Sequence, residues 1–153
     1  MRVVAIVQAR LSSTRLPGKV LQEIGGKTML ARVLQRILRA TLVDGVTLAT
    51  TDREVDDPVA REGRKIGVSV FRGNEDDVLD RYYRAAAEAR ADAVVRITAD
   101  CPLIDPEVVD RVAAAFLSER SDYASNVLAR MYPRGLDTEI MTFGALARAW
   151  REA

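Results

Sequence analysis

The sequence contains no histidine and only one cysteine, Cys101. Without histidine, the protein can have neither a Ser-His-Asp triad, nor an imidazole general base, nor a histidine-ligated zinc ion. A single cysteine also excludes an internal disulfide and a multi-cysteine metal site. Any chemistry must therefore come from carboxylates, Lys and Arg, hydroxyls, backbone amides and hard metal ions.

An excess of charge of one sign is also missing, since 23 basic residues stand against 22 acidic ones. This balance argues against a dedicated nucleic-acid-binding protein. No apolar run approaches the roughly 20 residues that cross a bilayer, and the N-terminus is charged too early for a signal peptide. We therefore expect a cytoplasmic protein with neither a nucleic-acid nor a membrane partner.

What the sequence does contain is a regular alternation of strand-like and helix-like segments. Aromatic residues make up only 5% of the chain, so its core must consist mainly of Val, Leu, Ile and Ala. The alternation predicts an α/β fold with three layers and a mostly parallel sheet. Strands are expected at 2–7, 43–51, 68–71, 93–98 and 138–143. Helices are expected near 29–38, 57–67, 106–118 and 144–153, and a further helix starts at 74. Because the last helix reaches Ala153 without a stop signal, we expect 1–153 to be one domain that is cut short on its C-terminal side.

Three helix starts can be read from capping residues. Asp57 precedes Pro58, and Asp105 precedes Pro106, which is the pattern of an N-cap followed by a first-position proline. Asn74 is expected to cap a helix whose first turn holds acidic residues, Glu75 to Asp77. The segment 26–28 (GKT) looks like the end of a P-loop but lacks its first glycine, so we interpret it as a turn and a helix start.

The loop after the first strand, QARLSSTRLPGK at 8–19, combines three cations with hydroxyl residues and a glycine. In open α/β sheets, ligands bind beyond the carboxyl ends of the strands. Hydroxyls and backbone amides can donate hydrogen bonds to phosphates, while Arg and Lys supply charge. From composition alone, a phosphate-binding loop and a solvated loop with incidental cations are both open.

Carboxylates occur at two positions that suit a metal or a substrate. Asp100 follows a buried strand directly, and Mg²⁺ favours one or two carboxylates together with substrate phosphates. The alternative is that Asp100 caps a turn. Asp137 and Glu139 form a D-x-E pattern similar to the D-x-D of glycosyltransferases, with solvated acids at a strand start as the alternative. Cys101 has no candidate base nearby in the sequence and is expected only to pack.

Four motifs in this chain resemble those of a known family. They are V-x-A-R-x-x-S-x-R-L-P-G-K from Val7, TTD at 50–52, FRGNEDDVLDRYY at 71–83 and RITADCPLID at 96–105. The set resembles the sugar-acid cytidylyltransferases, which make CMP-activated Kdo and neuraminic acid, and within them the spore coat polysaccharide biosynthesis protein F branch. The resemblance covers essentially the whole chain. It implies a glycosyltransferase-A-like, Rossmann-like nucleotide-binding fold.

The resemblance also implies an activity. It indicates a Mg²⁺-dependent transfer of CMP from CTP to a sugar or sugar acid, with release of pyrophosphate, for surface polysaccharide synthesis. Gln8 stands where the Kdo- and sialic-acid-activating branches have proline, which leaves the acceptor sugar open. A glycosyltransferase that uses a nucleotide-sugar and a shortened, non-catalytic nucleotide-binding module are the alternative functions. A homodimer is left open.

Residue roles are carried over from the matching motifs. Arg10, Lys19 and Asp100 are the implied catalytic residues, and Asp100 is the implied metal ligand. The implied nucleotide contacts are Ala9, Arg10, Ser13, Arg15, Lys19, Arg72, Asp77 and Thr98. Arg134, Asp137 and Glu139 are the implied acceptor contacts, with Asp137 or Glu139 as a candidate second metal ligand.

Overall fold

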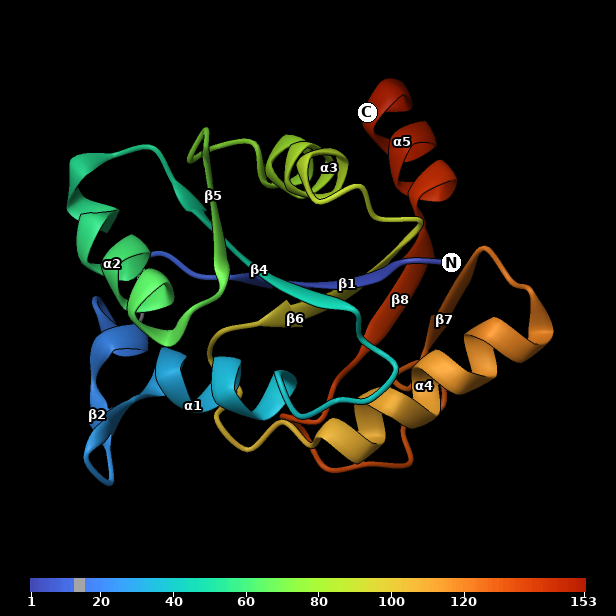
Figure 1. Ribbon diagram of the computed structural model, residues 1–153, viewed down its shortest axis with the longest axis horizontal. Coiled ribbons are helices and arrows are strands. Elements are labelled where there is room, and N and C mark those ends of the chain that lie inside the picture. Colours follow the sequence, from blue (N-terminus) through green and yellow to red (C-terminus); the bar gives the residue numbers. More distant parts are fainter. Residues whose placement is uncertain (13–15) are drawn as a thin grey trace.

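A six-stranded sheet divides the protein into two helical layers (Figure 1). The structure is a computed structural model that describes residues 1–12 and 16–153. The strand order across the sheet is β5 (Ser69–Gly73), β4 (Gly45–Thr51), β1 (Val3–Gln8), β6 (Ala93–Thr98), β8 (Glu139–Thr142) and β7 (Tyr123–Ser125). The pairs β5–β4, β4–β1 and β1–β6 are parallel, whereas β8 runs antiparallel to both β6 and β7. The predicted three-layer, mostly parallel α/β fold is therefore confirmed.

Each face of the sheet is covered by its own helices. One face packs against α1 (Met29–Ile37), α2 (Asp57–Ile66) and α4 (Pro106–Glu119), and the other against α3 (Val78–Glu88) and α5 (Phe143–Glu152). Strand β1 is buried on both faces, because Val3, Ala5 and Val7 face the first layer while Val4 and Ile6 face the second. This is why its sequence is a continuous apolar run.

A short hairpin precedes α1. Its strands β2 (Glu23–Ile24) and β3 (Lys27–Thr28) are joined by Gly25 and Gly26, both at positive φ. The Thr28 hydroxyl accepts a hydrogen bond from the Ala31 amide and caps α1. The segment that resembles a P-loop is thus a turn and a helix start, as predicted. Two single-turn 3₁₀ helices, Lys19–Leu21 and Glu54–Asp56, complete the regular structure described here.

Two predicted helix starts were wrong. Helix α2 has Asp56, not Asp57, as its N-cap residue, and Pro58 is its second residue. Helix α3 begins at Val78, and its cap is Asp77, which accepts from the Asp80 amide at 2.8 Å. Asn74 instead accepts from the Asp76 amide within the preceding loop, a local turn that competes with helix formation. Asp105 caps α4 as predicted.

The sheet brings four loops to one edge. Gln8 lies opposite both Ala49 of β4 and Thr98 of β6, and Thr51 lies opposite Gly73 of β5, so these strands end at similar heights. The strand order also reverses between β1 and β6. Ligands bind at such a reversal in open α/β sheets. Within the described ranges, no helix has the length and apolar character that a membrane span requires.

Candidate active site

A cavity of about 400 Å³ opens at this edge, between the loops that follow β1 and β6. Seven of its lining residues have polar or charged side chains: Gln8, Arg10, Ser12, Lys19, Arg96, Thr98 and Asp100. Arg10 and Asp100 therefore line one cavity, as the parallel arrangement of β1 and β6 predicts. A cavity of similar volume, about 410 Å³, lies at the opposite edge, where β1, β4 and β5 begin. Both cavities are lined by cations, hydroxyls and a carboxylate. We place the site at the first one because it lies at the carboxyl ends of β1 and β6, where the strand order reverses and where ligands bind in open α/β sheets.

Lys19 and Asp100 form an ion pair across the cavity. The Lys19 Nζ lies 2.6 Å from the Asp100 Oδ2, with 22% of the lysine side chain and 40% of the aspartate side chain exposed. Partial burial raises the pKa of Asp100, but hydrogen bonds from Lys19 and Thr98 outweigh it and hold this pKa below the usual aspartate value. Gly18, at φ 71°, allows the turn that directs Lys19 toward the strand ends. Asp100 is therefore an ionised carboxylate at neutral pH.

The donor set at Asp100 fits a magnesium ion that is completed by substrate. The carboxylate is accessible, and Mg²⁺ binds in nucleotide enzymes through one or two carboxylates plus phosphate oxygens and water. Among the residues that the structure describes, no three or more His, Cys, Asp or Glu side chains cluster closely enough to hold an ion. Asp137 and Glu139 therefore do not join Asp100 in one carboxylate cluster, and an ion at Asp100 would need ligands from the nucleotide.

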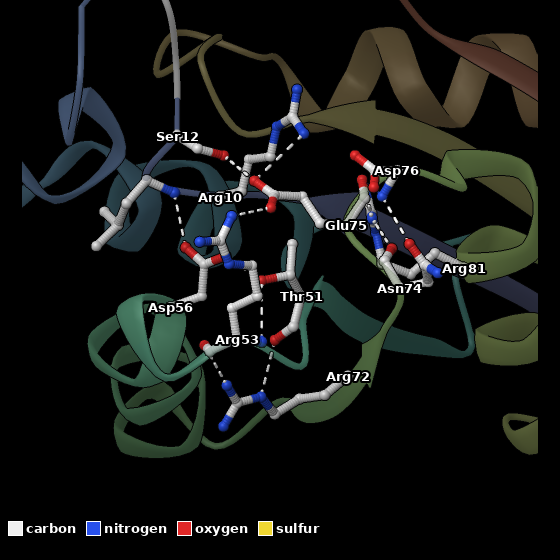
Figure 2. Close-up of polar contacts among 11 residues, drawn as sticks. Arg10, Ser12, Thr51, Arg53, Asp56, Arg72, Asn74, Glu75, Asp76 and Arg81 are labelled. Carbon is white, nitrogen blue, oxygen red and sulfur yellow. Dashed lines mark hydrogen bonds and ion pairs between the residues drawn. The ribbon is translucent and has the colours of Figure 1, made fainter.

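Glu75 links three loops beside the cavity (Figure 2). Its carboxylate accepts a 2.6 Å hydrogen bond from the Ser12 hydroxyl, forms an ion pair with Arg53, and lies 3.8 Å from the Arg10 Nη1. The hydrogen bonds from Ser12 and then from Arg53 lower the pKa of Glu75. The predicted role of Glu75 in a first helical turn was wrong, because it lies before α3 and bonds to the loop after β1.

The loop that carries Glu75 is held in place by Arg81, a residue of α3 (Figure 2). Arg81 is only 1% exposed, and its Nη1 donates to the backbone carbonyls of Asn74 and Glu75. Burial lowers the pKa of Arg81. A buried guanidinium that binds two consecutive carbonyls fixes the course of this loop and hence the position of the Glu75 carboxylate.

Asp56 anchors the beginning of the loop after β1. This residue is completely buried, and its carboxylate accepts hydrogen bonds from the Leu11 amide at 2.7 Å and from the Thr51 hydroxyl. Because Thr51 ends β4 and Leu11 follows β1, one carboxylate ties the two neighbouring loops together. The position of Arg10, next to Leu11, depends on this contact.

The remaining predicted nucleotide residues have varied surroundings. Ala9 is buried, lines the cavity, and donates its amide to Ala49. Arg72 donates to the carbonyls of Thr51 and Arg53 (Figure 2). It also donates to Asp57, which ties β5 to the start of α2. Asp77 caps α3. Nucleotide contacts by these residues stay predictions, and Ser13 and Arg15 lie outside the described residues.

A second, smaller cavity of about 170 Å³ adjoins the first over β6 and β8. It is lined by Arg96 and Thr98, which also line the first cavity, and by Arg130, Asp137 and Glu139. Two ion pairs cross it. Arg96 Nη1 lies 2.7 Å from the Glu139 Oε2, and Arg130 contacts both Asp137 oxygens, at 2.8 and 3.2 Å.

Two of the three predicted acceptor residues, Asp137 and Glu139, thus line this second cavity, whereas Arg134 is not among its lining residues. The hydrogen bond from Arg130 lowers the pKa of Asp137, to which the charge of Arg134 adds. Arg134 itself is exposed. Substrate contacts by Arg134, Asp137 and Glu139 stay predictions.

Sequence reasoning missed several residues at the site, among them Arg53, Glu75 and Arg96. Two of them had a signal. Arg53 follows the carboxyl end of β4, where ligand-binding loops occur, and Arg96 is the one charged residue in the strand AVVRIT. No local pattern in the sequence pointed to Glu75 as a site residue, because its partner Ser12 is 63 positions away.

Comparisons with known proteins agree with this geometry. Residues 4–153 match the family described as cytidylyltransferase. The spore coat polysaccharide biosynthesis protein SpsF of Bacillus subtilis is 37% identical over 79% of this chain, and 3-deoxy-manno-octulosonate cytidylyltransferase of Geobacter metallireducens is also 37% identical over 79%. These alignments cover 52% and 47% of the two relatives, so the chain spans about half their length. The solved structure of a cytidylyltransferase from Leptospira borgpetersenii superposes with a TM-score of 0.95 at 37% identity, over all of this chain and 65% of the other.

Proposed function

Because this chain belongs to the cytidylyltransferase family, we propose that it transfers the cytidylyl group of CTP to a hydroxyl of a sugar or sugar acid. The observation that carries the proposal is the pair of adjoining cavities that share Arg96 and Thr98. The first cavity has the cations for a triphosphate, and the second has polar side chains for a hydroxyl-rich acceptor. A transferase needs such a junction, where two substrates meet at the reacting phosphorus.

In the proposed reaction, an acceptor oxygen forms a bond to the α-phosphorus of CTP. The bond from this phosphorus to the oxygen of the leaving group breaks, pyrophosphate departs with the electron pair, and the acceptor proton passes to solvent. Lys19 and Arg10 bind the triphosphate through charge-assisted hydrogen bonds and so orient it. Catalysis of this kind depends on positioning and electrostatic stabilisation, for which no histidine is needed.

Asp100 would hold the magnesium ion. When bound, Mg²⁺ would offset negative charge on the phosphates and on the leaving pyrophosphate. Within the protein, Asp100 also keeps Lys19 extended across the cavity, since the two side chains are paired at 2.6 Å. Release of Lys19 toward the phosphates and release of Asp100 toward the metal would then occur together.

The acceptor is proposed from the second cavity and from the relatives. Paired Arg and carboxylate side chains offer donors and acceptors to several hydroxyls of one sugar. The names of the two curated relatives point to a spore coat polysaccharide and to 3-deoxy-manno-octulosonate. We take an activated sugar for a surface polysaccharide, made in the cytoplasm, as the product.

The test is release of pyrophosphate by the purified protein given CTP, Mg²⁺ and 3-deoxy-manno-octulosonate or N-acetylneuraminate. The controls omit the acceptor, replace CTP with UTP, or use Lys19→Ala. Release that requires CTP and an acceptor supports the proposal. Sugar transfer from a nucleotide-sugar without pyrophosphate release would indicate a glycosyltransferase, and CTP binding without turnover would indicate a nucleotide-binding module.

A further inference from the structure

Arg96 occupies the boundary between the two cavities. It lies on β6 two residues before Thr98. Both residues line the cavity of about 400 Å³, which is the larger of this adjoining pair, as well as the smaller one of about 170 Å³. Of the cations that line the larger cavity in the described ranges, Arg96 alone is carried by a strand; Arg10 and Lys19 belong to the loop after β1. The backbone of Arg96 is therefore fixed by the parallel β1–β6 and antiparallel β6–β8 ladders.

The guanidinium of Arg96 is supported from one side and paired from another. Its Cζ lies 6.0 Å from the centre of the Tyr82 ring, which belongs to α3 and is 5% exposed. Burial raises the pKa of Tyr82 to about 12, so the ring is uncharged and can carry a cation on its face. Glu139, directly opposite on β8, accepts from Nη1 at 2.7 Å.

This arrangement leaves the guanidinium partly accessible. The Arg96 side chain is 42% exposed and that of Glu139 is 24% exposed. Glu139 takes one of the five N–H donors of the guanidinium, so a bidentate oxyanion could bind at the others. The Arg96 guanidinium is thus held by the Tyr82 ring and by the backbone of β6. An incoming oxyanion can replace Glu139 as its partner.

From these contacts we infer that Arg96 is a catalytic residue that binds the transferring α-phosphoryl group, and that Glu139 is a positioning residue that holds Arg96 until the nucleotide arrives. The inference rests on the proposed function, because it assumes a nucleotide in the larger cavity and an acceptor in the smaller one. The reacting phosphorus must lie where the two cavities meet, and negative charge develops there during transfer. A fixed guanidinium at that point stabilises this charge.

The test is calorimetric binding of cytidine, CMP and CTP to the parent protein and to single variants. Arg96→Gln removes the cation and should weaken CMP and CTP binding by the same factor, roughly 30-fold or more, with cytidine unchanged. Arg96→Lys keeps the charge but loses the fork, so it should restore part of this loss. Lys19→Ala should differ, because it should weaken CTP more than CMP.

Glu139→Gln should change the affinity for CMP in the direction opposite to that of Arg96→Gln. Without the competing carboxylate, CMP should bind about two- to fivefold more tightly, which a purely structural role of the ion pair would not produce. Arg84→Gln is the matched control, since it breaks the Arg84–Asp80 ion pair on α3, outside both cavities. It should leave the binding of all three ligands unchanged.

The outcomes separate this inference from the proposed function. If the parent binds CTP and CMP but Arg96→Gln binds CMP as the parent does, or loses cytidine binding to the same extent, the role of Arg96 is wrong and the proposed function stands. Weaker CMP binding by Glu139→Gln would likewise contradict the inference that the nucleotide phosphate replaces Glu139 as the partner of Arg96. A parent protein that binds none of the three ligands overturns the proposed function and this inference with it.

Discussion

The Lys19 Nζ lies 2.6 Å from the Asp100 Oδ2, although 81 positions separate the two residues in the chain. The contact exists because β1 and β6 are parallel neighbours, so that the loops following them share one edge of the sheet. It brings a cation suited to phosphate and a carboxylate suited to a metal into direct contact. Each then keeps the other extended across the cavity in the free protein.

Lys19→Ala should weaken the binding of CTP far more than that of cytidine. Removal of one partner from a largely desolvated charge contact costs on the order of 2–5 kcal/mol. Titration calorimetry with both ligands measures the difference. Lys27→Ala is the control, because Lys27 bonds to Gln35 beside the hairpin that precedes α1. Equal losses for CTP and cytidine would mean that Lys19 does not contact phosphate.

Asp100→Asn should leave the fold intact and abolish most turnover. The substitution retains the size of the side chain but removes the charge that binds Mg²⁺, so turnover should fall by roughly 100-fold or more. Its free energy of unfolding should change by less than about 1 kcal/mol, since Asp100 belongs to a partly exposed ion pair.

Titration of the parent and of Asp100→Asn with CTP, with and without Mg²⁺, measures the role in metal binding. Metal-free CTP binding should stay the same or rise in the variant, because Asp100 repels phosphate when no ion is present. If the variant keeps the metal dependence of the parent, Asp100 is not the ligand.

The stabilising effect of the Lys19–Asp100 pair should disappear in acid. The pKa of Asp100 is lower in the folded protein than the ordinary value of about 3.9. Below about pH 5 the unfolded chain therefore binds more protons than the native state, and the free energy of unfolding rises with pH in this range. The contribution is complete above about pH 5 and is lost as the pH falls through the folded pKa. Urea unfolding of the parent and of Asp100→Asn should give curves whose difference shrinks toward about pH 3.

Five of the six strands of the sheet and most helices could be predicted because they depend on local patterns, whereas β7 (Tyr123–Ser125) was not predicted. Apolar runs such as 3–7 and 93–95 mark strands that are buried on both faces. The start of α3 could not be predicted. Asn74 and the acids after it satisfy every local capping rule, but Arg81 binds the carbonyls of residues 74 and 75 and Ser12 binds Glu75, which keeps this segment out of the helix.

Glu75→Gln should strengthen CTP binding several-fold. The amide can still accept the Ser12 hydrogen bond, which keeps the loops connected, but the negative charge beside Arg10 and Arg53 is gone. Phosphate then meets two cations that have lost their Glu75 partner. Competition binding against a fluorescent nucleotide measures the effect, and Asp76→Asn, at the exposed neighbouring acid, is the control. A loss of affinity for CTP would show that the main role of Glu75 is to hold the loops in place, and that its neutralisation of Arg10 and Arg53 matters less.

Asp56→Ala should destabilise the protein by about 1–3 kcal/mol, because the Leu11 amide and the Thr51 hydroxyl lose a buried acceptor. Urea unfolding measures the change, with the exposed Asp52→Ala as the control. CTP affinity of the folded fraction should also fall, since Asp56 positions the loop that carries Arg10. Unchanged stability would contradict the anchoring role.

The candidate site could be predicted only in part. Arg10 and Asp100 closely follow β1 and β6, so the topology brings them together, whereas Lys19 stands at the far end of the loop after β1 and its role came from the family motif. The contact between Arg96 and Glu139 depends on the register of the antiparallel strands β6 and β8. The sequence alone does not give this register. Arg53 and Glu75 depend on two loops that meet across β4 and β5.

The described cations of the larger cavity each lie beside a carboxylate: Lys19 beside Asp100, Arg10 beside Glu75, and Arg96 beside Glu139. Paired charges cancel beyond a few ångströms, so these three described pairs project little positive potential into solvent. Capture of a triphosphate should accordingly proceed at a rate that depends weakly on ionic strength. Orthophosphate and sulfate, which can displace one carboxylate at most, gain little by entering, whereas a nucleoside triphosphate can exchange with several pairs at once. The protein can thereby discriminate against the small inorganic anions that would otherwise occupy a bare cationic cleft.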